Sequence, residues 1–327
     1  MQKPAQSKFW LFAVIAIFVE LSVSQAAAQI YPDKPIRMLV GLSPGGSTDV
    51  SARLVAQKLT EYLGQAVIVE NRTGAGGSIA IERAVSSPPD GYTLLMAPAS
   101  TAILPSLRSK LPYDIERDLA PISLVVTGPY VLVIHPSVPA RNIAELIGLA
   151  RSQPGKLSYG SDGVGSALYL AGELFKLMAK LDIVHVPYKG GAESAIANAA
   201  GQVDISFPSL TSSRPLIGTG KLKPLAVTTI KRTALAPSLP TLDESGLPGY
   251  NRSGWVGLLA PAAVPKNIIT RLNMAVVKVV NTPEMKEALN KQGQDPQTNS
   301  PEQFAAFIRG EIEQNANLIK LTGVKAD

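Results

Sequence analysis

A glycine-rich loop stands between an apolar run and a helical pattern near the start of the sequence. It reads SPGGSTD over residues 43–49, and apolar side chains recur at helical spacing from Val50 to Leu63. The first N–H groups of a helix have no main-chain partner and carry partial positive charge. Glycine lets a ligand approach such a backbone closely, so a phosphate or a carboxylate would suit this loop.

The same arrangement occurs again in LSYGSDGVGSAL, residues 157–168. Two such loops predict a cleft whose two walls present N–H groups to one anion. Each loop also has an explanation without a ligand. Ser47 would serve as an N-cap, Asp49 is favourable in the first turn of a helix, and the glycines suit tight turns. It is the pairing of the two loops that favours a binding site.

Neither loop matches a nucleotide-binding motif, because no Gly-Lys-Ser/Thr ending is present and the third glycine of the dinucleotide pattern is missing. The chain has no cysteine and no G-x-S-x-G motif. Its two histidines, His135 and His185, fall in predicted strands, where a structural role is the simpler interpretation. The sequence therefore favours binding over catalysis, without metal or cofactor. An exported hydrolase of a small ester or amide is the alternative.

The N-terminus has the three regions of a secretory signal: Lys3 and Lys8, an apolar run over 9–19, and three alanines ending at Ala28. We expect cleavage near Ala28 and a periplasmic protein, and the absence of cysteine excludes a lipid anchor on that residue type. Lys and Arg number 31 against 25 Asp and Glu, and aromatic residues make up 6 %. The small basic excess is scattered, so no nucleic-acid partner is predicted.

The hydrophobic pattern alternates between strands and helices, which predicts an α/β fold with parallel strands. The order changes after about residue 249, where one strand is followed by three helices. A late return of the chain explains that change: we predict a first domain of residues 29–128 plus 250–327 and a second of residues 129–249. Strands are predicted at 36–42, 66–71, 93–97, 130–136, 156–161, 182–188, 203–207, 223–229 and 254–261. Helices are predicted at 50–63, 77–85, 142–153, 168–178, 192–200, 266–281, 283–291 and 301–321.

Several segments together resemble the extracytoplasmic solute receptors of tripartite tricarboxylate transporters, also called Bug receptors. In the first half they are YPDKPIRMLV, SPGGSTDVSARLVAQKL, VIVENRTGAGG, PPDGYTLL and KLPYDIERDLAPISLV. In the second half they are LAGELFK, DIVHVPYKGGA, GLPGY and PEQFAAFIRGEI. The resemblance covers nearly the whole chain after the signal, in order.

The resemblance implies a type II periplasmic binding protein fold, with two doubly wound α/β domains joined by crossing strands and a ligand cleft between them. It implies a small organic carboxylate as ligand, and membrane transport subunits or a sensor as partners; we expect a monomer. The ligand-binding residues that we predict are Pro44, Gly45, Gly46, Ser47, Thr48, Asp49, Ser100, Thr101, Gly163, Val164, Gly165, Ser166, Pro208 and Ser209.

The sequence departs from the family pattern around the distal end of the ligand. Pro208 and Ser209 occupy a segment where the family often has an acidic residue, and Tyr169 stands where a histidine is frequent. Residues 100–104 read STAIL in place of polar His and Asn. These changes predict a ligand with a less polar distal end, such as an aromatic or aliphatic monoacid.

Overall fold

The computed structural model describes residues 31–108 and 110–324, so the predicted signal peptide lies outside the described residues. The first of two sheets is six-stranded, in the order β11-β4-β10-β3-β1-β2. Strands β1, β2 and β3 are mutually parallel, as predicted, while β10 runs antiparallel to both β3 and β4. The strands are β1 (Ile36–Val40), β2 (Val67–Asn71), β3 (Thr93–Pro98), β4 (Leu119–Pro129), β10 (Ser253–Pro261) and β11 (Asp295–Pro296).

The second sheet has five strands in the order β7-β6-β8-β5-β9. It repeats the plan of the first: β6 lies between its parallel partners β7 and β8, and the antiparallel β5 separates β8 from β9. In each sheet the antiparallel strand belongs to a segment that crosses from the other half of the molecule. The strands are β5 (Val131–Ile134), β6 (Ser158–Ser161), β7 (Val184–Pro187), β8 (Ile205–Ser206) and β9 (Lys223–Val227).

Helices cover both faces of the sheets, because the buried strands are apolar on both sides. Along β1, Ile36 and Met38 pack in one cluster with α2 and α10, while Leu39 faces the other with α3 and α12. Around the first sheet lie α2 (Ser47–Leu63), η1 (Ala75–Gly77), α3 (Ser78–Val85), η2 (Ala99–Ala102), α4 (Leu104–Leu107), α5 (Ile115–Asp118), α10 (Lys266–Val280), α11 (Pro283–Lys291) and α12 (Pro301–Thr322). Around the second lie α6 (Ile143–Ser152), α7 (Ala167–Ala179), α8 (Gly191–Ala199) and α9 (Leu210–Gly218).

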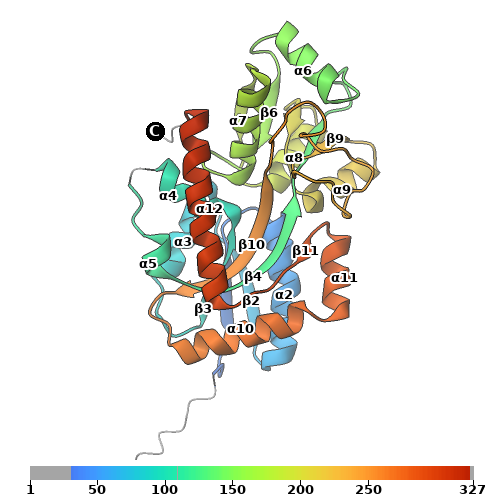
Figure 1. Ribbon diagram of the computed structural model, residues 1–327. Helices are drawn as coiled ribbons and strands as arrows, with labels where there is room; N and C mark the ends of the chain where they lie inside the picture. The colour runs from blue at the N-terminus through green and yellow to red at the C-terminus, as the bar shows by residue number, and fades with distance from the viewer. Residues whose placement is uncertain (1–30, 109, 325–327) are drawn as a thin grey trace, which may run out of the picture.

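Two paired strands carry the chain between the halves (Figure 1). β4 leads through Tyr130 directly into β5, and the chain returns through Arg252 into β10. Thr228 joins the two crossings: its hydroxyl lies 2.6 Å from the Arg252 carbonyl oxygen, and the Tyr130 N–H donates to that hydroxyl at 3.1 Å. β4 was not predicted from the sequence. Any relative motion of the two halves has to bend these two strands.

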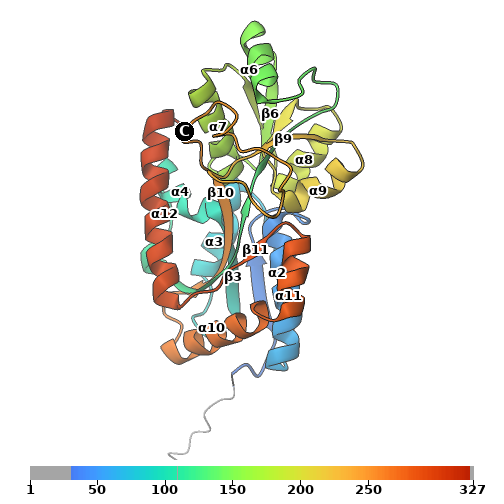
Figure 2. The same cartoon turned by 45° about the vertical axis from the view of Figure 1, so that its right-hand side comes forward.

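The long C-terminal helix α12 contacts β4, α4 and α7, so it lies against both halves (Figure 2). Trp255 of β10 packs edge-on against Phe304 and Phe307 of α12, and its indole N–H donates to Glu311 at 3.0 Å. These contacts attach α12 to the crossing strand. Among the described residues, none of the helices combines the length and the apolar character needed to cross a bilayer.

Candidate functional site

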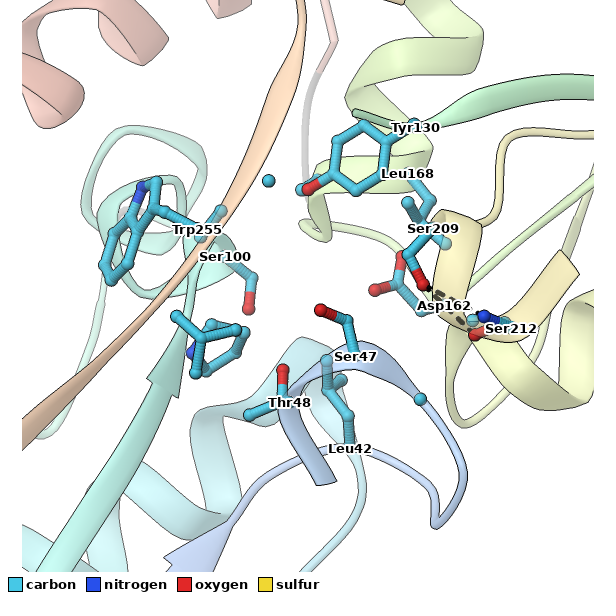
Figure 3. Close-up of a pocket in the computed structure, with 17 residues that line it drawn as sticks. Leu42, Ser47, Thr48, Ser100, Tyr130, Asp162, Leu168, Ser209, Ser212 and Trp255 are labelled. Carbon is cyan, nitrogen blue, oxygen red and sulfur yellow. Dashed lines mark hydrogen bonds between the residues drawn. The ribbon is translucent and has the colours of Figure 1, made fainter. Parts of the chain in front are cut away.

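A cavity of about 50 Å³ lies where the two halves meet. The first half contributes the start of α2, the end of β3 and the start of β10, and the second half contributes the starts of α7, α8 and α9. Figure 3 shows the hydroxyl groups of Ser47, Ser100 and Tyr130 pointing toward the same space. The carboxyl group of Asp162 is directed into that space from the opposite side. None of the 17 lining residues is Lys, Arg or His.

The N-terminus of α2 forms one wall. Gly46 is the N-cap, so the alternative role of Ser47 as an N-cap does not apply, and no side chain caps this helix. The hydrogen bonds within the described residues therefore leave the N–H groups of Ser47 and Thr48 without an acceptor. Gln294 donates from its side-chain amide to the Ser47 hydroxyl at 2.7 Å, so Ser47 is free to donate its own proton into the cavity. This wall is a set of donors suited to an anion.

Asp49 lies outside this cavity, although we predicted it as a ligand-binding residue. Its carboxylate accepts from the Gly45 N–H at 3.0 Å, from the Arg53 guanidinium at 2.9 Å and from the Asn71 amide at 2.9 Å. Burial by itself raises the pKa of Asp49, but these hydrogen bonds and the Arg53 charge bring it below its usual value. Asp49 therefore holds the loop in shape, and Gly45 uses its N–H within the loop.

The second glycine loop is placed differently from the prediction. Gly163 and Val164 line a separate, outer cavity of about 270 Å³, and Ser166 is a buried N-cap that accepts from the Tyr169 N–H at 3.1 Å. The residue that reaches the inner cavity is Asp162, which also borders the outer one. The sequence analysis missed Asp162 as a site residue. The loop thus contributes an acid where we expected only N–H donors.

Asp162 is 6 % exposed, and its Oδ1 atom has no hydrogen-bond partner among the described residues. Burial raises the pKa of Asp162 to about 6, although the Ser166 hydroxyl and the N–H groups of Asp162 and Leu168 favour the ionised form. Ser100 is the counterpart on the other wall: it is 1 % exposed and its hydroxyl is likewise unpaired in the described chain. Buried polar atoms are nearly always paired, so this cavity is shaped for a polar ligand.

Four helices begin at the cavity. α2 contributes Ser47, α7 contributes Leu168, α8 contributes Gly191, and α9 begins after its N-cap Ser209. Each helix N-terminus carries a partial charge equivalent to roughly half a proton. The wall is therefore electropositive without any basic side chain, a property that favours anions. Asp162 is the one formal charge in it.

Of the predicted ligand-binding residues, some line the inner cavity and others do not. Gly46, Ser47, Thr48, Ser100 and Ser209 line it. Pro44, Gly45, Asp49, Thr101, Gly163, Val164, Gly165, Ser166 and Pro208 do not. Thr101 is fully buried, and Pro208 uses its carbonyl to accept from the Val131 N–H at 2.9 Å. Leu42 supplies apolar surface beside Ser47, and Leu168 supplies it on the opposite wall, where Asp162 makes the lining more polar than we predicted.

The two halves touch across the cleft. A Cβ atom on Gly190 would lie 2.0 Å from the Ser43 hydroxyl oxygen, and one on Gly76 would lie 3.3 Å from the Val164 carbonyl oxygen. The inner cavity has room for roughly three to five water molecules, since each needs about 10–15 Å³ of such space. The structure therefore shows a closed cleft, and entry of a ligand requires the Ser43 and Gly190 loops to separate.

Folding brings His185 beside Ser161, with the ring Nε2 at 2.7 Å from the hydroxyl oxygen. This is the contact that a hydrolase would need, but Ser161 is fully buried and does not line the cavity. The ring lies against Tyr159 and Tyr169, and burial lowers the pKa of His185 to about 4. The pair is a structural contact. In the described part of the chain no cluster of acidic or histidine side chains is arranged to hold a metal ion.

Residues 51–324 match the model of the tripartite tricarboxylate transporter family receptor. The chain belongs to this family. This chain is 35 % identical to the BugT protein of Bordetella pertussis over 319 aligned residues. The aligned region covers 96 % of this chain and 98 % of BugT. The family consists of periplasmic solute-binding receptors.

Solved structures agree with this assignment. The periplasmic binding protein BugD is 32 % identical with a TM-score of 0.88, over 91 % of this receptor and 100 % of BugD. Rpa4515 of R. palustris, solved with adipate, is 34 % identical with a TM-score of 0.88, over 90 % of this receptor and 99 % of its own chain. The type II periplasmic binding protein fold is therefore confirmed.

The receptor's cavity includes residues that sequence reasoning missed: Leu42, Tyr130, Asp162, Trp255 and, behind Ser47, Gln294. A signal existed for Asp162, because it stands inside the second glycine loop, next to the residues that we singled out. No local signal marks Tyr130, since it stands at the chain crossing, or Gln294, which meets Ser47 from 247 residues away.

Proposed function

We propose that this receptor captures a small organic carboxylate between its two domains. The observation that carries the proposal is the convergence of four helix N-termini, each with partial positive charge, on one cavity that has no basic side chain. The carboxylate accepts from the N–H groups of Ser47 and Thr48 and from the Ser47 hydroxyl that Gln294 orients. The adipate in the related Rpa4515 structure supports this ligand class.

The two crossings support the domain limits that we propose. We assign residues 29–128 and 250–327 to the first domain and residues 129–249 to the second, with β4–β5 and β10 as the hinge strands. The receptor is exported to the periplasm after cleavage near Ala28 and acts as a monomer. It presents its ligand to membrane transport subunits or to a sensor, and it performs no catalysis.

A binding screen tests the proposal. The purified receptor is titrated by calorimetry with mono-, di- and tricarboxylates, and the unfolding temperature is followed in parallel. A ligand that binds only the folded protein raises that temperature by mass action. Ser47→Ala is expected to weaken binding by about tenfold, because it removes a hydrogen bond to a charged group. Ser152→Ala, on the exposed face of α6, is the matched control.

Two results would contradict the proposal. The first is the absence of binding with every acid of the screen. The second is a loss of affinity in Ser152→Ala as large as that in Ser47→Ala, because the effect would then not arise in the cleft.

A further inference from the structure

Asp162 is the feature of the cavity that a simple carboxylate leaves unexplained. It is buried, its Oδ1 atom is unpaired among the described residues, and it faces the cavity from the wall opposite Ser47 and Ser100 (Figure 3). An ionised carboxylate in such a place needs an opposite charge or a proton. A bound acid with no positive group would bring a second negative charge to the same small space.

The surrounding protein offers no such positive group on the cavity side. Tyr130 is the other titratable side chain of the lining, and burial raises its pKa, so it stays a neutral hydroxyl. On the outer side, Arg108, Tyr188 and Lys189 border the second cavity together with Asp162. Neither cation forms an ion pair with Asp162 in the described structure. Where Asp162 is ionised, the positive charge that pairs with it therefore comes with the ligand.

We propose that Asp162 binds an ammonium group of the ligand, so that this receptor recognises amino acids in preference to unsubstituted carboxylates. The inference rests on the proposed function, since the ligand carboxylate is held at the start of α2. The two ends of the ligand are then bound by opposite walls of the cavity. Hydrogen-bond donors of the first domain hold the carboxylate, and an acceptor of the second domain holds the ammonium group. The assignment deepens the site beyond the prediction of a monoacid with an apolar end.

The direction of the pH dependence follows from the same geometry. Burial raises the pKa of Asp162 to about 6, so the side chain is largely ionised only above that pH. Binding of an ammonium group should therefore strengthen as the pH rises from about 5 to about 7.5. A ligand whose second carboxylate accepts a hydrogen bond from protonated Asp162 would show the opposite trend.

The test compares acids that differ only by an amino group: alanine with propionate, 4-aminobutyrate with butyrate, and glutamate with glutarate. Calorimetry is carried out at about pH 7.5 on the full-length purified receptor, on Asp162→Asn and on Asp162→Ser. Asp182→Asn, on the exposed surface of the same domain, is the matched control. Unfolding of each variant without ligand verifies that it is folded.

The amino member of at least one pair should bind the unmodified receptor at least about tenfold more tightly than its partner, because hydrogen bonds to charged groups are strong. Asp162→Asn and Asp162→Ser should abolish that preference, and Asp182→Asn should retain it. If acids bind but the member without the amino group binds more tightly, or the preference survives in both variants, the assignment of Asp162 is wrong while the carboxylate receptor stands. If no acid of either kind binds, the proposed function itself is refuted.

Discussion

The unpaired carboxyl group of Asp162 should make the stability of the empty receptor depend on pH in a way that one substitution removes. Its pKa is about 6 in the folded protein against an ordinary value of 3.8, because burial disfavours the charged form. Since the folded-state pKa is raised, protonated Asp162 favours the folded protein. This contribution to the free energy of unfolding is fully present below about pH 3.8 and is lost as the pH rises through about 6. The difference between the folded pKa of about 6 and the ordinary value of 3.8 corresponds to about 3 kcal/mol in the free energy of unfolding.

Urea unfolding of the unmodified receptor and of Asp162→Asn, measured at several values between about pH 4 and pH 8, checks this magnitude. All other titrating groups are common to both proteins, so they cancel in the difference between the two free energies of unfolding. That difference should change in favour of Asp162→Asn by about 2.4 kcal/mol between about pH 4 and pH 8. Parallel curves for the two proteins would refute the reasoning, because Asp162 would then titrate equally in the folded and unfolded chains.

Three further predictions concern the loops around the cavity. Asp49→Ala should lower the free energy of unfolding by about 2 kcal/mol, since the Gly45 N–H and its other donors lose their acceptor, as measured by urea unfolding. Gly190→Ala should weaken ligand binding about tenfold or more in calorimetry, because its methyl group would collide with Ser43 and keep the cleft open. His185 should stay neutral down to about pH 4, observed as a histidine resonance in an NMR titration.

Each of these has a comparison that isolates its cause. Asp49→Asn keeps one acceptor oxygen and should lose less stability than Asp49→Ala; equal losses would contradict the hydrogen-bond explanation. Gly148→Ala places a methyl group on α6 where nothing lies within 4 Å, and it should bind ligand normally. A His185 resonance that titrates near its ordinary pKa of 6.5 would show that the ring is accessible to water.

Local patterns predicted most of the elements but not the crossing strand. The periodicity of 142–153 and 266–281 matches α6 and α10 to within one residue at each end. β4 was missed, because Pro121, Gly128 and Pro129 interrupt its apolar run. The pairing of β4 with β10 stabilises it nonetheless. Such a strand depends on a partner more than 120 residues away, which no local pattern contains.

The candidate site was predictable where it depends on a helix start and unpredictable where it depends on distant contacts. Ser47 and Thr48 follow from a glycine loop before a helix. The second loop has the same pattern, yet Asp162 and the N-cap Ser166 turn it into a different wall. Equal motifs gave unequal surfaces because the side chains within the loops compete with a ligand for the same N–H groups.

The two unpaired atoms also indicate how a ligand should stabilise the closed cleft. Ser100 belongs to the first half of the molecule and Asp162 to the second, and the closed structure buries both. A buried polar group without a partner costs about 1–3 kcal/mol, so a ligand that pairs both atoms stabilises the closed form by about 2–6 kcal/mol. This free energy corresponds to a roughly 30- to 10⁴-fold shift toward the closed form when such a ligand binds. A ligand that satisfies both atoms removes this cost at once, whereas one that satisfies only the Ser47 wall leaves Asp162 unpaired. Selectivity and closure therefore have the same cause. The solute that forms hydrogen bonds with both walls of the cavity is the one that shifts the equilibrium toward the closed form.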